Sequence, residues 1–386
     1  MTLTRGDRLH WGLKPLVRLY LNQKFHLQIL ENPLESLEGP YLLLGHHVTA
    51  FDPLMANLLS ARLIRFVASD VNYDAPVKKF FLEHLEAIPF SKNHADSKAV
   101  RLLLKHVEAG HPVGLYPEGG RNWDGETERL IPSTAKLVKL LKVPVYQIRS
   151  FGGYLSKPRW ASHFRKGKLQ LAVRKILDPE EIRIKSAEEI RILLEEALAY
   201  NEYDWQRKAR IPFLGKQRAE HIQRLLYLCP QCGSWNTQKS QGNAFQCTAC
   251  GLHHEVDVYG FLQGSGPFAD AAAWNRWQRV ALGDLLEKGF TFENPELSLE
   301  VIPEGRPRTK EKITLIFQRD HLTLKRPSSE EILRFEDLGS LSITLLDVVE
   351  FYQGTTKYRL VFEPEKHMSV KLFYDLLALL LMKGSV

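Results

Sequence analysis

The chain of 386 residues is 44% hydrophobic and 25% charged, a composition that excludes a disordered protein and is typical of a soluble globular one. Its length exceeds a single hydrophobic core, so we expect two or three domains. The formal net charge of +7 favours a polyanionic partner: nucleic acid, anionic lipid or a phosphorylated substrate. The apolar run 376–382 is shorter than the roughly 20 residues of a membrane-spanning helix. The N-terminus lacks a secretory signal, which predicts a cytoplasmic location.

The first 24 residues combine basic side chains with an aromatic and leucine-rich face. The segment contains one acidic residue, Asp7, and five basic residues, Arg5, Arg8, Lys14, Arg18 and Lys24. One interpretation is docking on an anionic membrane surface. The other is a packed helix with a solvated basic face. Pro15 is expected to interrupt any long helix in this segment.

Apolar runs then alternate with amphipathic segments, which predicts an α/β domain with a largely parallel sheet and flanking helices. The segments are 41–44, 54–63, 65–68, 77–85, 99–107, 113–116, 135–141, 143–148 and 168–173. Basic residues gather around Trp160, as a second surface patch or merely a loop: Lys157, Arg159, Arg165, Lys166 and Lys168. A helical stretch, 186–199, leads into a basic connector, 206–218. We place the end of the first domain near residue 215.

The stretch LGHHVTAFDP, residues 44–53, lies between a buried strand and a helix expected to begin at Pro53. Loops at this edge of an α/β sheet usually carry the chemistry. A loop that folds back can bring the Asp52 carboxylate onto Nδ1 of His47, which leaves Nε2 free as a general base. The alternatives are a helix-capping Asp beside a surface His, or a metal site of His46, His47 and Asp52 that lacks an obvious further ligand.

A second segment, GLYPEGGRNWDG at residues 114–125, also follows a strand-like run. Gly119 and Gly120 allow the backbone to approach a ligand closely, and Arg121 offers a guanidinium fork suited to phosphate. The segment is therefore interpreted as an anion site. A surface turn with an Arg–Glu pair is the alternative.

With both segments in view, residues 1 to about 200 resemble the glycerophospholipid acyltransferase family, which includes 1-acylglycerol-3-phosphate acyltransferases. The family motif N-H-x-S-x-x-D is matched by HHVTAFD, with His46 in the Asn position and Thr49 in place of Ser. The motif F-P-E-G-T-R-S is matched by YPEGGRN, in which Tyr116, Gly120 and Asn122 are substitutions.

Two further motifs are less complete. V-P-V-x-P is matched by residues 143–145, with Gln147 where the second proline is expected. The pattern G-x-I-x-x-x-R is degraded at residues 87–92, where Lys92 replaces the Arg. Lys92 keeps the positive charge of the arginine but lacks its bidentate fork, so the motif leaves the identity of the acyl acceptor open.

The resemblance implies an O-acyltransferase of phospholipid biosynthesis. His47 would deprotonate the hydroxyl of a lysophospholipid such as 1-acylglycerol 3-phosphate, with Asp52 as its partner. The hydroxyl would attack an acyl thioester of coenzyme A or acyl carrier protein directly, without a serine or cysteine nucleophile. The implied substrate-binding residues are Thr49, Lys92, Glu118, Gly119 and Arg121. Glycerol 3-phosphate or a non-phosphate lysolipid is an alternative acceptor. A peripheral location on the inner face of an anionic membrane would give access to the lipid.

All four cysteines fall in one window as C-x-x-C, 14 residues, C-x-x-C: Cys229, Cys232, Cys247 and Cys250. This spacing predicts a zinc ribbon, residues 216–258, with a structural site because four thiolates leave no open position. Disulfides are the alternative, disfavoured without an export signal. We expect φ > 0 at Gly233 and Gly251, and surface positions for His253 and His254.

The ribbon also supports a hypothesis from another class, a zinc-ribbon nucleic-acid-binding protein. The window from Cys229 to Gly251 contains one Lys and no Arg, which gives no electrostatic footprint for phosphate, so no nucleic-acid partner is expected.

Residues 259–386 have a different pattern. A helix is expected at 269–287 and another at 370–383, with Ser369 as N-cap. Short alternating runs lie between them, at 312–317, 321–325, 331–335, 341–343, 348–352 and 357–362. We expect a β-rich domain closed by a helix, a small sandwich or barrel for which a pleckstrin-homology-like module is our suggestion.

Overall fold

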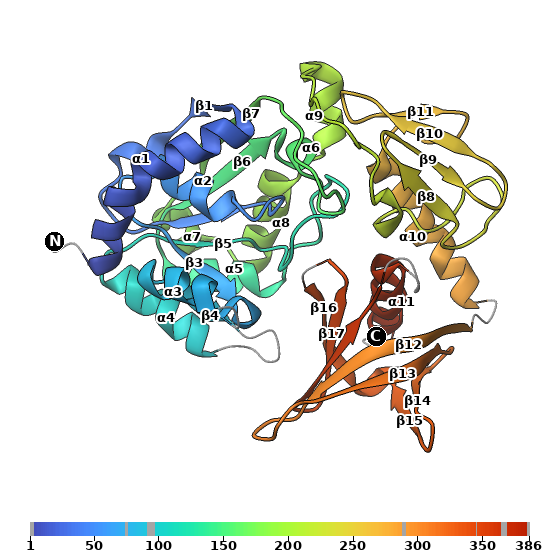
Figure 1. The fold of residues 1–386 in the computed structure, drawn as a ribbon. Coiled ribbons are helices and arrows are strands. Elements are labelled where there is room, and N and C mark those ends of the chain that lie inside the picture. Colours follow the sequence, from blue (N-terminus) through green and yellow to red (C-terminus); the bar gives the residue numbers. More distant parts are fainter. Residues whose placement is uncertain are drawn as a thin grey trace. The chain divides into compact units, whose positions relative to one another are not determined.

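The computed structural model describes residues 4–73, 76–90, 97–287, 291–344, 346–363 and 369–383. The chain divides into two compact units (Figure 1). Unit 1 comprises residues 1–159, 163–215 and 258–260, and unit 2 comprises residues 160–162, 216–257 and 261–386.

Unit 1 is built on a seven-stranded sheet in the order β1-β7-β6-β2-β5-β3-β4. The strands are β1 Leu27–Glu31, β2 Leu42–Gly45, β3 Arg65–Ser69, β4 Ile88–Phe90, β5 Val113–Leu115, β6 Val145–Phe151 and β7 Leu169–Leu177. Five neighbouring pairs are parallel, and β6 with β7 is antiparallel. The prediction of a largely parallel sheet with flanking helices is confirmed.

Helices cover both faces of this sheet. The helices of unit 1 are α1 Arg5–Phe25, α2 Asp52–Leu59, α3 Pro76–His84, α4 Ser97–Glu108, α5 Ser133–Leu141, α6 Gly153–Ser156, α7 Pro179–Ile184, α8 Ala187–Leu198 and α9 Glu202–Ala209, with short 3₁₀ turns at Pro33–Ser36 and Asp70–Tyr73. Along β2, Leu42 and Leu44 pack into the core lined by α4, α5 and α8, whereas Leu43 packs into the core lined by α1 and α2. Because β2 is buried on both faces, its sequence is an uninterrupted apolar run.

Helix α1 continues through Pro15, contrary to the expected interruption. Proline cannot donate to the carbonyl of Trp11, but both residues are exposed, so water can satisfy that carbonyl. The helix begins with a capping box between Thr4 and Asp7. No helix of the described residues is long and apolar enough to cross a membrane.

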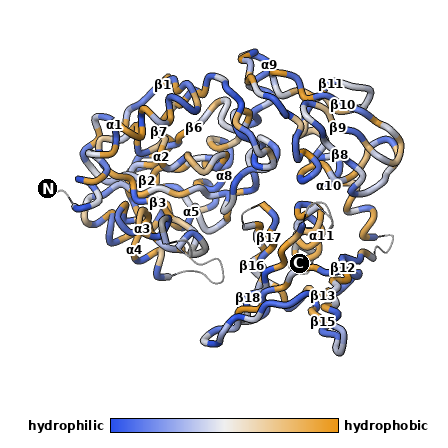
Figure 2. The backbone as a smooth tube through the Cα atoms, in the orientation of Figure 1, coloured by the Kyte–Doolittle hydropathy of each residue, from blue (hydrophilic) through white to orange (hydrophobic). Residues whose placement is uncertain are grey.

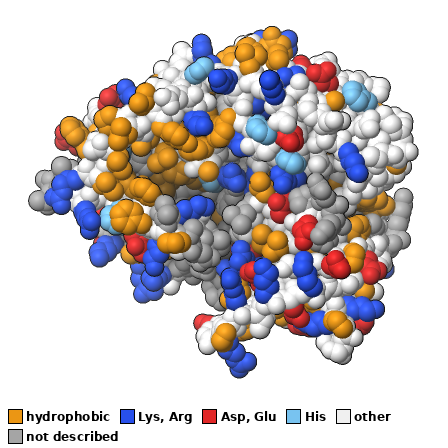
Figure 3. Space-filling view, in the orientation of Figure 1, with side chains coloured by type: hydrophobic (Ala, Val, Ile, Leu, Met, Phe, Trp, Pro, Cys, Tyr) orange, Lys and Arg blue, Asp and Glu red, His pale blue; other side chains and the backbone are white. Residues whose placement is uncertain are grey.

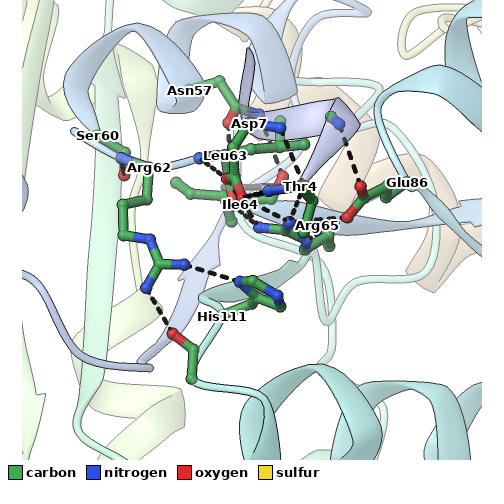
Figure 4. A network of polar contacts seen from close by, with 12 residues as sticks. Thr4, Asp7, Asn57, Ser60, Arg62, Leu63, Ile64, Arg65, Glu86 and His111 are labelled. Carbon is green, nitrogen blue, oxygen red and sulfur yellow. Dashed lines mark hydrogen bonds and ion pairs between the residues drawn. The ribbon is translucent and has the colours of Figure 1, made fainter. Parts of the chain in front are cut away.

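A buried arginine connects α1 to the sheet (Figure 4). Arg65, the fully buried first residue of β3, forms ion pairs of 3.2 Å with Asp7 and 2.7 Å with Glu86. It also donates to the Leu63 carbonyl at 2.7 Å and to the Thr4 hydroxyl at 3.0 Å. Removing one partner of such a buried pair typically costs about 3–5 kcal/mol, because a charge is left uncompensated. The network therefore fixes the start of α1 against β3.

In unit 2, the cysteine segment carries a four-stranded antiparallel sheet in the order β11-β10-β9-β8. The strands are β8 Gln238–Gln241, β9 Ala244–Cys247, β10 His253–Val256 and β11 Leu262–Gly264, preceded by a 3₁₀ turn at Ile222–Arg224. His253 is exposed, but the expected surface position of His254 is wrong. His254 is 1% exposed, with its ring 5.2 Å from those of Phe245 and Trp274. Strand alternation turns it inward onto a helix that lies later in the chain.

The rest of unit 2 is a seven-stranded antiparallel sheet and a C-terminal helix. The strands run in the order β15-β14-β13-β12-β18-β17-β16. They are β12 Phe292–Ile302, β13 Thr309–Phe317, β14 His321–Lys325, β15 Glu330–Arg334, β16 Leu338–Thr344, β17 Val348–Gln353 and β18 Thr356–Val361, with a 3₁₀ turn at Phe335–Asp337. Helix α11, Val370–Lys383, is hydrophobic along much of its length (Figure 2). The β-rich region is confirmed; the pleckstrin-homology assignment stays a prediction.

Helix α10, Ala271–Glu287, connects the ribbon to this region. The amide of Gln278 accepts from the backbone N–H of Tyr227 at 3.1 Å and donates to the Leu225 carbonyl at 2.8 Å. The Tyr227 hydroxyl donates to Asp375 of α11 at 3.0 Å, and Lys371 pairs with the same carboxylate at 2.6 Å. The ribbon is thus held by buried polar groups of two helices far away in the sequence.

Candidate active site

The two motif loops of unit 1 follow neighbouring parallel strands. β2 pairs with β5 in the register Leu42 to Val113 and Leu44 to Leu115. The loop that begins at His46 and the loop that begins at Tyr116 therefore leave the same edge of the sheet. Sequence-distant side chains meet there because parallel strands end side by side.

His47 and Asp52 are in direct contact. Nδ1 of His47 lies 2.8 Å from Oδ2 of Asp52. The same carboxylate accepts from the backbone N–H of Val48 at 2.8 Å and of Thr49 at 2.9 Å. With Nδ1–H donated to the carboxylate, Nε2 carries the lone pair. Among the described residues Nε2 has no hydrogen-bond partner, and the His47 side chain is 23% exposed.

The backbone of His47 is held from the second motif loop. Its N–H donates to Oε1 of Glu118 at 3.0 Å, and its carbonyl accepts from the N–H of Asn122 at 2.6 Å. Oε2 of Glu118 accepts from the N–H of Glu128 at 3.0 Å. Burial raises the pKa of Glu118 to about 8, although these backbone donors oppose the shift. Both side-chain oxygens of Glu118 accept hydrogen bonds from backbone N–H groups, so Glu118 holds the backbone of His47 in place.

Arg121 presents the cation of the site. Burial lowers the pKa of Arg121, and the charge of Asp52 opposes that shift. Within the described part of the chain its guanidinium forms no hydrogen bond or ion pair. Its carbonyl accepts from Arg159 at 2.6 Å, and the Arg159 guanidinium lies 4.4 Å from the ring centre of Trp123. Arg121 is thus a charged group whose backbone is fixed and whose side chain is uncommitted.

The remaining predicted site residues differ in what they contact. Thr49 is 1% exposed and donates its hydroxyl to Oδ1 of Asp52 at 2.7 Å, so it holds the carboxylate. Gly119 has φ +72°, a conformation that L side chains rarely adopt, and its N–H donates to the Tyr116 carbonyl. Gln147 donates to the Ala197 carbonyl of α8 at 2.6 Å. Lys92 lies outside the described residues.

His46 is buried, and its ring contacts β6 and Tyr200. It is 4% exposed, its Nε2 lies 3.5 Å from the Ser150 carbonyl, and its ring stacks on Tyr200 with 5.0 Å between centres. Burial lowers the pKa of His46 to about 4, so the imidazole is neutral near pH 7. Within the described residues, His46, His47 and Asp52 do not converge as metal ligands.

Residues 24–150 match the acyltransferase family model. This segment belongs to the acyltransferase family. The resemblance inferred from the two motifs is therefore confirmed. A search of the curated proteins found no match.

Two solved structures are similar to parts of the chain. One is the 1-acyl-sn-glycerophosphate (LPA) acyltransferase PlsC from Thermotoga maritima, at 17% identity and a TM-score of 0.45, covering 52% of this chain and 79% of that one. The other is the Inner Membrane Complex Sub-compartment Protein 3 from Toxoplasma gondii, at 13% identity and a TM-score of 0.19, covering 29% of this chain and 88% of that one.

Sequence reasoning missed an aromatic stack beside His47. The Tyr116 ring lies between His47, 4.6 Å away at 17°, and Phe66 of β3, 5.3 Å away at 8°. The sequence did contain one signal for this stack, because Tyr116 keeps an aromatic ring at the motif position that carries Phe in the family. Phe66, some fifty positions earlier, gave no local signal.

Among the basic residues near Trp160, Lys166 and Lys168 are exposed, whereas two others are buried. Arg159 and Arg165 are buried, at 6% and 3% exposure. Arg159 supports the backbone of the acyltransferase site, and Arg165 packs against Gly215 at the end of unit 1.

In unit 2 the four cysteines converge. Their sulfurs all lie within 4.8 Å of one another, with 3.7 Å between Cys229 and Cys250 and 3.8 Å between Cys232 and Cys247. A tetrahedral zinc ion with bonds of about 2.3 Å separates its sulfurs by about 3.8 Å, so the quartet fits four-thiolate coordination. Gly233 and Gly251 follow the knuckles with φ +69° and +78°.

Proposed function

We propose that this protein transfers a fatty acyl group from an acyl thioester to the hydroxyl of a lysophospholipid, such as 1-acylglycerol 3-phosphate. The observation that carries the proposal is the His47–Asp52 pair, which lies in the acyltransferase-family segment with Nε2 unpartnered. Coenzyme A or acyl carrier protein would carry the acyl group.

The pair supports a direct transfer. Nε2 of His47 takes the proton of the acceptor hydroxyl while the hydroxyl oxygen forms a bond to the thioester carbonyl carbon. Asp52 keeps the proton of Nδ1 in place and stabilises the imidazolium. When the tetrahedral intermediate collapses, the carbon–sulfur bond breaks and the imidazolium returns the proton to the thiolate. The base is therefore restored, and no acyl-enzyme forms.

The second motif loop offers groups for the developing negative charge. The N–H groups of His47, Val48, Thr49, Gly119 and Asn122 are already engaged. In the described part of the chain the N–H groups of Gly120 and Arg121 form no hydrogen bond. We assign these two as the donors to the oxyanion.

We assign the binding of the acceptor's phosphate group to two basic side chains. The uncommitted Arg121 guanidinium can take a phosphate bidentately, and Lys92 would add a second charge. Glu118 is not assigned to the acceptor, because its oxygens hold the backbone of His47 and Glu128.

We also propose that α1 brings the enzyme to an anionic membrane. Hydrophobic side chains gather over α1 (Figure 3), and the exposed ones are Trp11, Leu16, Leu19 and Tyr20. Exposed Arg8, Arg18 and Lys24 flank them. An apolar face between cations favours insertion at a lipid interface.

The test is an acceptor panel with purified enzyme. Radiolabelled acyl-coenzyme A and acyl carrier protein thioesters would be offered with 1-acylglycerol 3-phosphate, glycerol 3-phosphate and a non-phosphate lysolipid. We expect the first acceptor to be preferred, and His47→Ala to lower the rate by about 10²–10⁴-fold without a change in melting temperature. His163→Ala, an exposed histidine of the same unit, is the control. Full transfer by His47→Ala, or no acylated acceptor, would refute the proposal.

A further inference from the structure

We propose that Tyr116 is a positioning residue for the base, acting through the face of its ring on the His47 imidazole. This inference rests on the proposed function, because it assigns Tyr116 a role in the proton transfer to His47. It concerns a residue that the motif comparison counts only as a substitution.

The stack is built from three neighbouring strands of the sheet. Phe66 belongs to β3, Tyr116 follows β5 and His47 follows β2, and these strands are adjacent. The planes of the Phe66 and Tyr116 rings differ by 8°, and those of the Tyr116 and His47 rings differ by 17°. The three rings are therefore stacked nearly parallel to one another. His47 is the outermost ring, and Phe66 is 6% exposed.

Two glycines make room for this stack. A Cβ at Gly114 would come within 2.5 Å of the Phe66 ring. A Cβ at Gly45 would come within 2.8 Å of the Ile148 side chain and 3.3 Å of the Tyr116 ring. One glycine lies two residues before Tyr116 on β5 and the other lies at the end of the neighbouring strand β2, and a side chain at either position would meet the stack or its neighbours.

The face of an aromatic ring is negative and attracts a cation above it. His47 becomes a cation only when it has taken the hydroxyl proton. Asp52 binds the edge of the imidazole at Nδ1, whereas Tyr116 covers its face. The two contacts act on the same imidazolium from different directions, so the ring face stabilises the proton transfer and fixes the plane of the base.

The hydroxyl of Tyr116 is not needed for this role. Its oxygen is buried, and it has no hydrogen-bond partner in the described part of the chain. Burial raises the pKa of Tyr116, so the phenol stays neutral. A buried hydroxyl without a partner is destabilising. Phenylalanine at this position should keep the stack and remove that cost.

The experiment compares Tyr116→Phe, Tyr116→Leu and Tyr116→Met. We expect Tyr116→Phe to retain the wild-type rate with an unchanged or higher melting temperature. We expect Leu and Met to lower kcat by about tenfold, with little effect on KM, and to move the acid limb of the pH–rate profile to lower pH, because the imidazolium is less stable without the ring. Two non-aromatic variants guard against one that does not fold.

A second readout is independent of turnover. Nuclear magnetic resonance of ¹⁵N-histidine-labelled protein, with His47 assigned from His47→Ala, should show the ring of His47 titrating at lower pH in Tyr116→Met than in Tyr116→Phe. Equal titration in the two variants, or a loss of activity in Tyr116→Phe as large as in Tyr116→Leu, would overturn the proposal. If wild type acylates no acceptor, the proposed function fails, while the titration still decides the role of Tyr116.

Discussion

At the scale of single residues, His47 is held at three points. Glu118 takes its N–H, Asn122 donates to its carbonyl, and Asp52 takes Nδ1. Asp52 is itself held by four donors from residues 47–49. The freedom of the imidazole is thereby reduced before any substrate binds, as its proposed role of general base requires.

A pH dependence follows from another single residue, Asp7. Burial alone would raise the pKa of Asp7, but the hydrogen bond and charge of Arg65 and the contacts with Thr4 outweigh burial and lower it to about 2. The ordinary pKa of an aspartate side chain is 3.8. Because the folded value lies below the unfolded one, Asp7 contributes stability above about pH 4, and this contribution is lost as the pH falls toward 2.

We therefore expect the free energy of unfolding to fall between pH 6 and pH 3 by about 1 kcal/mol more in wild type than in Asp7→Asn. Urea unfolding at both pH values measures it. Asp284→Asn, an exposed acid of α10 in unit 2, is the control for a general loss of negative charge. The same pH dependence in wild type and Asp7→Asn would contradict the assignment.

At the scale of elements, α1 has a buried start and an exposed apolar face. Its buried start is fixed by Arg65, whereas Trp11, Leu16 and Leu19 are 72%, 64% and 59% exposed. The ring of Tyr20 lies 5.9 Å from that of Phe51, the residue before Asp52. The exposed face thus adjoins the loop that carries His47 and Asp52.

We expect the double variant Trp11→Ser, Leu19→Ser to bind vesicles of phosphatidylglycerol and phosphatidylcholine at least about tenfold more weakly than wild type, because each buried large side chain contributes roughly 1.5–3 kcal/mol. Co-sedimentation measures the binding. Val280→Ser, which changes a 71% exposed side chain of α10, should bind as wild type does. Equal binding by all three proteins would rule out α1 as the docking element.

At the scale of the whole molecule, the chain has two units with separate cores and separate polar centres. His47 and Asp52 lie in unit 1. The cysteine quartet lies in unit 2, in the same segment as Tyr227, which contacts Gln278 of α10 and Asp375 of α11. Thr237 lies 3.1 Å from the sulfur of Cys247 and can orient it. We propose that a structural zinc ion closes this quartet.

The metal is therefore expected to stabilise unit 2 rather than to take part in acyl transfer. We expect about one zinc per chain by elemental analysis. A strong chelator should open the ribbon, which limited proteolysis with mass spectrometry would detect as new cleavages within residues 229–251. Cys232→Ser should lose zinc, and His253→Ala, an exposed neighbour on β10, should keep it. Metal-free wild-type protein that resists cleavage would refute a structural zinc site.

The sequence by itself determined the parts of this protein that depend on local spacing. Hydrophobic periodicity predicted the parallel sheet and most of its helices, and the short turns of the β-rich region were visible in the same way. The motif spacing indicated His47 and Asp52, because the two residues are five positions apart in one short loop whose local conformation can bring them together. The cysteine spacing indicated the ribbon.

Only the tertiary structure decided what depends on residues distant in the chain. β1 pairs with β7 across more than a hundred residues, and β12 accommodates Pro295 through a register shift between Asn294 and Leu297. His254 is buried because a later helix covers it. Glu118 binds the backbone of His47, and Tyr116 stacks on its ring. These contacts leave no local pattern, because burial and polar pairing are set by which strands and helices become neighbours, and that is a property of the packed chain.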